Sequence, residues 1–377
     1  MAHIRTTHVG SMPRGDELVP LLGARDRGEP YDAAEFDRLV STAVDEAVRR
    51  QVEAGVDIVS DGEIGKIGYS TYMIERLSGF GGHVDRKPAQ DLAAHPGLAR
   101  KLSAMMGSQD FVRASCVGKV ELVTLEPLHD DIRRFRAALD KHATSATEAF
   151  MNAASPGLIS AFQLNRHYPT QQAYLADLAA AMRPEYEAIV DAGFYLQLDC
   201  PDLAMSRHTG FQDLSEAEFL AVAEQNVAAL NEATASIPPE RMRMHVCWGN
   251  YEGPHDCDIA LEKVIGTILK ARPATILFEA ANPRHEHEWT VWRDADLTGK
   301  TLAPGLIDTC SNYVEHPELI AQRIERFAAI VGPERVIAST DCGFGTFAGY
   351  GKIDPEVTWK KLRALREGAE IAGARLG

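Results

Sequence analysis

Short apolar runs alternate with longer amphipathic stretches, and this rhythm constrains the fold of the chain more than any other feature. Runs such as FYLQLD (194–199), MRMHVC (242–247) and TILFEA (275–280) have the length and composition of buried strands. The stretches between them space apolar residues at helical intervals, and several end at a glycine, as helices often do. The alternation predicts parallel strands joined by helical crossovers.

Eight strand candidates fit this description. They end at HVGS (8–11), DIVSDGE (57–63), LISAFQL (158–164), FYLQLD (194–199), MRMHVC (242–247), TILFEA (275–280), LAPGLID (302–308) and RVIASTDC (335–342). Eight is the strand number of the (β/α)₈ TIM-type barrel, and a chain of 377 residues suits one such barrel with insertions. We therefore expect an α/β fold in which residues 1–377 form a single barrel domain, with a doubly wound open sheet as the structural alternative.

The rhythm breaks between about residues 64 and 150. This segment contains the apolar run ASCVGKVELV (114–123), which is a candidate ninth strand. We expect an insertion made of a hairpin and helices here.

Charge and composition exclude several classes of partner. The formal net charge is −15, and no run of lysine or arginine is dense enough to follow a phosphate backbone, so we expect no nucleic acid. No apolar stretch approaches the roughly 20 residues that span a bilayer. The N-terminal sequence MAHIRTTHVGSMPR lacks the apolar region of a signal peptide, so we expect no membrane association and a cytoplasmic location.

Most of the strand candidates end in a residue capable of chemistry, and in a barrel those ends share one face. His245 and Cys247 are two positions apart, so in a strand their side chains point to the same side. Glu279 and Cys342 end later strands and complete a set of one nitrogen, two sulfur and one oxygen ligand. Such a set favours zinc over magnesium or calcium, so we predict a Zn²⁺ site.

The remaining cysteines and histidines are weaker candidates. Free cysteines in apolar surroundings are usually buried for structural reasons. We apply this interpretation to Cys116, Cys200 and Cys257. Four ligands already fill a zinc site, so we expect His285 and His287 to orient substrate or support the site rather than coordinate the metal. The sequence leaves the roles of His8 and His255 open.

Six motifs resemble, in chain order, the catalytic barrel of cobalamin-independent methionine synthases. They are HVGSMPR near the start, SDGE (60–63), LQLDCPDL (196–203), HVCWGN (245–250), FEAANPRHEHEW (278–289) and STDCGFG (339–345). The resemblance covers most of the chain and is weakest between about 80 and 150. CWGNYEGPH, PRHEHEW and YVEHPELIAQRI are more similar to short single-barrel relatives that include epoxyalkane:coenzyme M transferase.

The resemblance implies roles for individual residues. The zinc ligands of the family fall on His245, Cys247, Glu279 and Cys342. Glu63 and Asp199 match the acidic residues that hold the amino group of homocysteine, and Ser11 matches the serine near its carboxylate. The further candidates for substrate binding are Trp248, Asn250, His285 and His287.

Two departures from the family pattern concern the methyl donor. The long synthases carry a second, N-terminal barrel that helps to bind a folate donor, and 377 residues leave no room for it. The synthases also have a histidine that assists proton transfer, and LAPGLIDTCSN offers Cys310 in its place. The candidate catalytic residues are therefore Glu63, Asp199 and Cys310, and the donor is left open.

These observations predict a zinc-dependent transferase that moves an alkyl group, most simply methyl, onto a small thiol such as homocysteine. Coordination to zinc would displace the thiol proton and hold a thiolate at the reaction centre. One alternative is epoxide opening by coenzyme M, with Arg5, Arg14 or Lys66 binding the sulfonate. Another is a non-catalytic zinc-binding protein, although the ligands lie far apart in the chain. The sequence leaves open whether a corrinoid carrier protein delivers the methyl group and whether the chain forms homo-oligomers.

Overall fold

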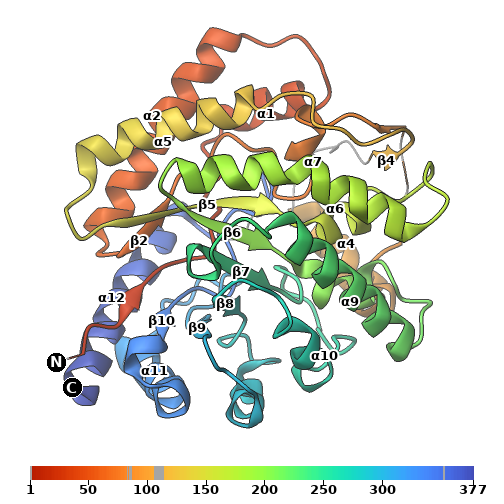
Figure 1. The fold of residues 1–377 in the computed structure, drawn as a ribbon. Coiled ribbons are helices and arrows are strands. Elements are labelled where there is room, and N and C mark those ends of the chain that lie inside the picture. The colour runs from red at the N-terminus through yellow and green to blue at the C-terminus, as the bar shows by residue number, and fades with distance from the viewer. Residues whose placement is uncertain (1, 83, 85–86, 106–113, 351–352) are drawn as a thin grey trace.

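The structure is a computed structural model that describes residues 2–82, 84, 87–105, 114–350 and 353–377. Eight parallel strands occupy its centre (Figure 1). They are β1 (Arg5–Thr6), β2 (Ile58–Ser60), β5 (Glu148–Ala154), β6 (Tyr195–Asp199), β7 (Met242–Val246), β8 (Thr275–Phe278), β9 (Thr301–Pro304) and β10 (Ile337–Ala338). Six of them form one sheet in the order β2-β5-β6-β7-β8-β9, and β1 pairs with β10.

The two sets of strands close into a ring. A parallel bridge between Gly305 and Ser339 joins the ends of β9 and β10. On the other side, the backbone N–H of Asp57, next to β2, donates a hydrogen bond of 3.2 Å to the carbonyl of Thr6 in β1. The fold is therefore the expected TIM-type barrel, and the open-sheet alternative is wrong because neither edge of the six-stranded sheet is left unpaired.

One of the eight strand predictions is wrong. The run LISAFQL (158–164) belongs mainly to the helix α6 (Pro156–Phe162), and the third barrel strand along the chain is β5, just before it. Ser155 caps this helix by accepting a hydrogen bond of 3.0 Å from the N–H of Leu158. A short apolar run buried on all sides has no periodicity that separates strand from helix, which is why the two were exchanged.

Helices surround the barrel (Figure 1). Outside the insertion, the longer ones are α1 (Leu18–Asp26), α2 (Ala33–Glu53), α5 (Glu126–His142), α7 (Gln171–Asp191), α9 (Glu216–Ala233), α10 (Leu261–Ile268), α11 (Pro317–Val331) and α12 (Pro355–Leu376). In α2, the buried residues Phe36, Val40, Val44 and Val48 recur every four positions and face the barrel core. Among the described residues, no helix combines the length and apolar character that crossing a membrane requires.

The segment after β2 is an insertion, as expected. It contains η1 (Tyr72–Glu75), an antiparallel pair of β3 (Phe80–Gly81) and β4 (Ser115–Cys116), and the helices α3 (Gln90–Ala93) and α4 (Pro96–Met105). The candidate ninth strand contributes only the two residues of β4. The insertion ends before α5, which packs against α2 as a regular barrel helix (Figure 1).

Short helical turns follow several strands and shape the mouth of the barrel. They are η2 (Pro201–Leu203) and α8 (Ser206–Thr209) after β6, and η4 (Glu286–Asp294) after β8. Two more, η3 (Pro239–Arg241) and η5 (Pro333–Arg335), precede β7 and β10. The turns after the strands place polar side chains at the carboxyl ends of the parallel strands, where barrel enzymes build their active sites.

Candidate active site

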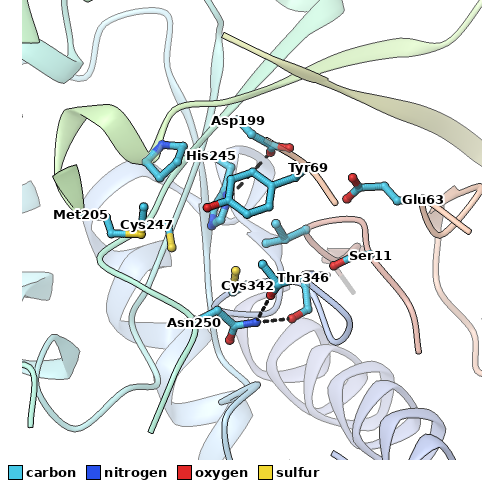
Figure 2. Close-up of a pocket in the computed structure, with 13 residues that line it drawn as sticks. Ser11, Glu63, Tyr69, Asp199, Met205, His245, Cys247, Asn250, Cys342 and Thr346 are labelled. Carbon is cyan, nitrogen blue, oxygen red and sulfur yellow. Dashed lines mark hydrogen bonds and ion pairs between the residues drawn. The ribbon is translucent and has the colours of Figure 1, made fainter. Parts of the chain in front are cut away.

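A cavity opens at the carboxyl ends of the barrel strands (Figure 2). The space between its atoms amounts to about 420 Å³, open mouth included. Its lining residues are Val9, Ser11, Glu63, Tyr69, Asp199, Pro201, Met205, His245, Cys247, Asn250, Cys342, Gly343 and Thr346. Ser11, Glu63, Asp199, His245, Cys247, Asn250 and Cys342 are thus brought to one place, although they come from distant parts of the chain.

One wall of the cavity carries sulfur and nitrogen. Potential ligand atoms of His245, Cys247 and Cys342 all lie within 4.8 Å of one another, and all three residues are buried. Figure 2 shows the two sulfur atoms facing the same space. His245 and Cys247 reach it together because side chains two positions apart along an extended chain point to the same side.

The protonation of this wall suits a metal ligand set. Burial lowers the pKa of His245 to about 4, so the imidazole is neutral near pH 7. Its Nε2 lies 3.1 Å from the carbonyl oxygen of Asp341, which can only accept, so this nitrogen carries the hydrogen and Nδ1 keeps its lone pair. The hydrogen bond with Cys342, together with burial, holds the pKa of the Cys247 thiol well above its usual value. Two neighbouring cysteine sulfurs beside a neutral imidazole fit a cation such as zinc, which displaces thiol protons.

Glu279 lies beside this group but is not part of it. Its carboxylate accepts a hydrogen bond of 2.7 Å from the backbone N–H of Trp248 and a longer one of 3.3 Å from the side-chain amide of Asn282. Burial raises the pKa of Glu279. The structure therefore brings three of the four predicted ligands together and holds the fourth next to Cys247 through a backbone contact.

A second wall of the cavity carries two buried carboxylates, Glu63 and Asp199, and it adjoins the first wall where Asp199 Oδ1 lies 3.8 Å from His245 Nδ1 (Figure 2). Asp199 accepts hydrogen bonds of 3.1 Å from the side-chain amides of Asn152 and Gln197. In the part of the chain that the structure describes, Glu63 Oε2 is buried without a hydrogen-bond partner. A buried carboxylate oxygen without a donor is costly unless a ligand supplies one.

The electrostatics of these two carboxylates favour a bound cation. Burial raises the pKa of Glu63 to about 7 and that of Asp199 to about 6, and the two groups interact with each other. The backbone of Glu63 has a φ of 53°, a strained value for a residue other than glycine. Arg14 supports this conformation by donating a hydrogen bond of 2.7 Å to the carbonyl of Glu63.

The three cations considered for binding a sulfonate do not line the cavity. Arg5 pairs with Glu148 at 3.0 Å, at the amino ends of β1 and β5 and thus at the opposite end of the barrel. Arg14 donates to backbone carbonyls, including that of Glu63. Lys66 is buried and donates a hydrogen bond of 2.7 Å to the carbonyl of Asn152. Among the described residues that line the cavity there is no lysine or arginine.

Ser11 and Asn250 form the remaining polar lining. Ser11 packs so closely on Gly343 that a Cβ atom there would lie 2.0 Å from the serine Oγ, so only glycine fits. Asn250 donates hydrogen bonds of 2.8 Å to the carbonyl of Gly343 and 2.6 Å to Oγ1 of Thr346. Cys310 lies behind this layer, where its thiol donates a bond of 3.2 Å to Oδ1 of Asn250. Burial raises the pKa of Cys310 well above its usual value.

Trp248, His285 and His287 lie outside the cavity lining. Trp248 is buried, and its indole N–H donates to the carbonyl of Ile259. The ring of His285 stacks on Trp248 with a centroid separation of 4.5 Å. His287 is exposed to solvent. Their participation in substrate binding stays a prediction.

Several residues of the site were missed from sequence. Gln197 lies two positions before Asp199 in β6, so the alternation of strand side chains could have revealed it. Asn152 was missed because its strand, β5, was not predicted. Tyr69 and Met205 reach the cavity from irregular segments, which carry no periodic signal.

The chain is similar to a known family of enzymes over most of its length. Residues 153–370, more than half of the chain, match the family described as cobalamin-independent synthase, catalytic domain. A methionine synthase of Thermococcus kodakarensis is 25% identical over 376 residues, which cover 98% of this chain and 94% of that protein. The uncharacterized protein YxjH of Bacillus subtilis is 25% identical over 373 residues, covering 96% of this chain and 93% of that protein.

A solved structure shares the fold over the full length. The B12-independent methionine synthase from Shewanella sp. W3-18-1, in complex with selenomethionine, superimposes with a TM-score of 0.73 at 21% identity. The superposition covers 100% of this chain and 99% of that one. The structural likeness shows the shared fold, and the family match over more than half of the chain shows that the chain belongs to the cobalamin-independent methionine synthase family.

Proposed function

We propose that this chain is a zinc-dependent methyltransferase whose acceptor is a small aminothiol of the homocysteine type. The observation that carries the proposal is that one cavity has two walls of different chemistry. The metal wall (His245, Cys247 and Cys342) offers nitrogen and sulfur to a metal, and the carboxylate wall (Glu63 and Asp199) offers oxygen to an ammonium group. Membership of the family and the named relatives support the same activity.

The carboxylate wall recognises the amino group. An ammonium has three N–H donors and one positive charge, and Glu63 Oε2 is a buried acceptor that has no donor of its own. Asn152 and Gln197 hold Asp199 from behind, which leaves its position fixed while the ammonium approaches. The bound cation would lower the pKa of both carboxylates and keep them charged.

The metal wall activates the thiol. When bound, zinc supplies a Lewis-acid centre that stabilises a substrate thiolate near neutral pH. His245, Cys247 and Cys342 would hold the ion, and Glu279 would be the fourth ligand, fixed by the backbone N–H of Trp248. The three clustered residues line an open cavity rather than a closed core, which favours a catalytic site over a purely structural one.

The two walls together orient the acceptor. An aminothiol whose ammonium lies between Glu63 and Asp199 directs its sulfur toward the metal wall (Figure 2). Tyr69, Met205 and Val9 contribute aromatic and apolar surface to the lining, which would reduce hydration of the bound sulfur. Fixing the nucleophile in this way lowers the entropic cost of an in-line displacement. We leave the methyl donor, a folate or a corrinoid carrier protein, to direct assay of each.

The cavity argues against coenzyme M as the acceptor. A sulfonate needs cationic donors, whereas the described lining carries two carboxylates and neither lysine nor arginine. Like charges would repel an anionic thiol that lacks an amino group. An epoxide-opening reaction with coenzyme M is therefore the weaker alternative.

Calorimetric titration of the zinc-loaded chain tests the proposal. Homocysteine should bind at least tenfold more tightly than 4-mercaptobutyrate, the same thiol without its amino group, and coenzyme M should bind more weakly than either. Tenfold corresponds to about 1.4 kcal/mol. Equal affinity for homocysteine and 4-mercaptobutyrate, or tighter binding of coenzyme M, would refute the assignment of the carboxylate wall. Formation of methionine from a labelled methyl donor then tests the reaction itself.

A further inference from the structure

A second group of metal-binding side chains lies outside the cavity lining. It comprises His208 in α8, His255 and Asp258 in the segment between β7 and α10, and His285 at the start of η4. The three histidines are buried, and the side chain of Asp258 is only 2% exposed. Potential ligand atoms of His255, Asp258 and His285 lie within 4.8 Å of one another.

Three imidazole nitrogens surround the carboxylate of Asp258. His255 Nδ1 and His285 Nε2 lie 2.8 Å and 2.9 Å from Oδ2, and His208 Nδ1 lies 3.1 Å from Oδ1. The contact to His208 does not have hydrogen-bond geometry: within the described chain, both His208 Nδ1 and Asp258 Oδ1 are buried without a hydrogen-bond partner. Two unpartnered buried atoms that face each other are explained by a ligand bound between them.

The outer nitrogens of the three rings are all held. His255 Nε2 lies 2.9 Å from the carbonyl oxygen of Tyr251, and His285 Nδ1 lies 2.8 Å from Oε2 of Glu288. His208 Nε2 lies 3.3 Å from the hydroxyl of Tyr251. A histidine that binds a metal through one nitrogen usually donates the other N–H to a carbonyl or carboxylate, and His255 and His285 fit that arrangement.

We propose that His208, His255, Asp258 and His285 form a second metal site, distinct from the thiol site, for a divalent transition-metal ion such as zinc. Three imidazole nitrogens and one carboxylate oxygen form a ligand set that zinc accepts. In a tetrahedral zinc site with bonds near 2.0–2.1 Å, ligand atoms are roughly 3.3 Å apart. The separations of 2.8 to 3.1 Å between the ring nitrogens and the Asp258 oxygens need to widen by only a few tenths of an ångström. His208 lies outside the group of three whose ligand atoms are within 4.8 Å of one another, so its ring would have to move toward the other two on binding.

The charge of the cluster is compatible with the replacement of ring protons by a metal ion. Burial alone would lower the pKa of His255 and His285. Hydrogen bonds to Asp258 outweigh burial and raise the pKa of His255 to about 9 and that of His285 to about 10. Glu288, Glu279 and Asp91 add further negative charge to the surroundings. A divalent ion that replaces the two ring protons leaves the buried charge unchanged.

Such an ion would join three segments around the active site. His208 follows β6, His255 and Asp258 follow β7, and His285 follows β8. The ring of His285 stacks on Trp248, whose backbone N–H holds Glu279. The insertion is attached to the same place, because Asp91 accepts hydrogen bonds from the hydroxyl of Tyr251 and the N–H of His255. The second ion would thus stabilise the segments that hold Trp248 and Glu279 beside the thiol site.

Zinc counting on the full chain tests this inference, which does not depend on the proposed function. The purified protein is stripped with a chelator, reloaded with zinc, freed of excess metal and analysed by inductively coupled plasma mass spectrometry. We expect two zinc ions per wild-type chain, one in the double variant Cys247→Ser, Cys342→Ser, and one in Asp258→Asn. His287→Asn is the matched control, because His287 is exposed and two positions from His285; it should retain two.

Absorption spectroscopy at the zinc edge identifies the ligands independently. The double cysteine variant should show a shell of nitrogen and oxygen only, and Asp258→Asn a shell that contains sulfur. One zinc per wild-type chain, in a sulfur-containing shell, would overturn the proposal even if a variant failed to fold. A thiol that adds no sulfur to the shell would contradict the proposed function but would leave the count of two intact, so the two failures are distinguishable.

Discussion

The two walls of the cavity both attract positive charge, but they do so with different atoms. His245, Cys247 and Cys342 offer nitrogen and sulfur, which bind a transition metal directly. Glu63 and Asp199 offer oxygen alone, and burial raises the pKa of both carboxyls, an effect that the nearby Lys66 offsets only in part. Under the proposed function, ligand chemistry within one cavity would separate a metal ion from an ammonium, and the same site would hold both ends of an aminothiol.

The largest expected effect comes from breaking the metal wall. Cys342→Ser should lower methyl transfer at least about a hundredfold, because it removes a soft ligand that a hydroxyl replaces poorly. Enzyme turnover and zinc content are measured on the same sample. Cys116→Ser is the matched control, since Cys116 is buried in β4, outside the cavity. Full activity of the Cys342 variant would remove this residue from the site.

Changing the carboxylate wall should affect the acceptor rather than the metal. Glu63→Gln removes the charge that faces the ammonium, so KM for homocysteine should rise about tenfold to a hundredfold, as expected for one hydrogen bond to a charged group. The same variant should be no less stable to heat, because it neutralises a buried carboxylate oxygen that has no partner. An unchanged KM would show that Glu63 does not hold the amino group.

The same wall makes stability depend on pH in the absence of substrate. The pKa values of about 7 for Glu63 and about 6 for Asp199 exceed their unfolded values, so the folded chain binds more protons than the unfolded chain between about pH 4 and pH 7. These two groups therefore make the free energy of unfolding fall as pH rises through that window. Denaturant titrations should show a smaller fall for the double variant Glu63→Gln, Asp199→Asn, and homocysteine should reduce the fall in the wild type. An identical pH slope in variant and wild type would contradict the burial of two charges.

The smallest effect is expected at the far end of the barrel. Arg5 and Glu148 form a partly exposed ion pair, and such pairs contribute about 0–1 kcal/mol to stability. Arg5→Ala should therefore leave KM for homocysteine unchanged and binding of coenzyme M equally weak. A selective loss of coenzyme M affinity in this variant, measured by calorimetry, would revive the sulfonate alternative.

The sequence predicted the barrel because buried parallel strands are short apolar runs that stand out between amphipathic helices. The strand β5, with the sequence EAFMNAA, was missed because alanine and asparagine have weak strand propensity, and its place was given to the neighbouring α6. The tertiary fold decides such cases. Here β5 is held as a strand because it pairs with β2 on one side and with β6 on the other.

The site was predictable where residues follow directly from strand geometry. His245 and Cys247 share a side by their spacing, and the closing of the barrel brings Cys342 to them. The orientation of Glu279 was not predictable, because it depends on a backbone N–H of a different strand end. The cluster around Asp258 was also invisible, since it is assembled from three separate loops. Side chains from irregular segments meet only through the tertiary fold.

Zinc K-edge absorption on the metal-loaded chain, with and without homocysteine, tests whether the substrate thiol binds the metal. Homocysteine should add one sulfur atom to the shell of the zinc held by His245, Cys247 and Cys342, and coenzyme M at the same concentration should add less. In the Cys247→Ser, Cys342→Ser variant, no sulfur should be added by either thiol. A sulfur-containing shell that neither thiol changes in the wild type would contradict the claim that this metal site activates an aminothiol.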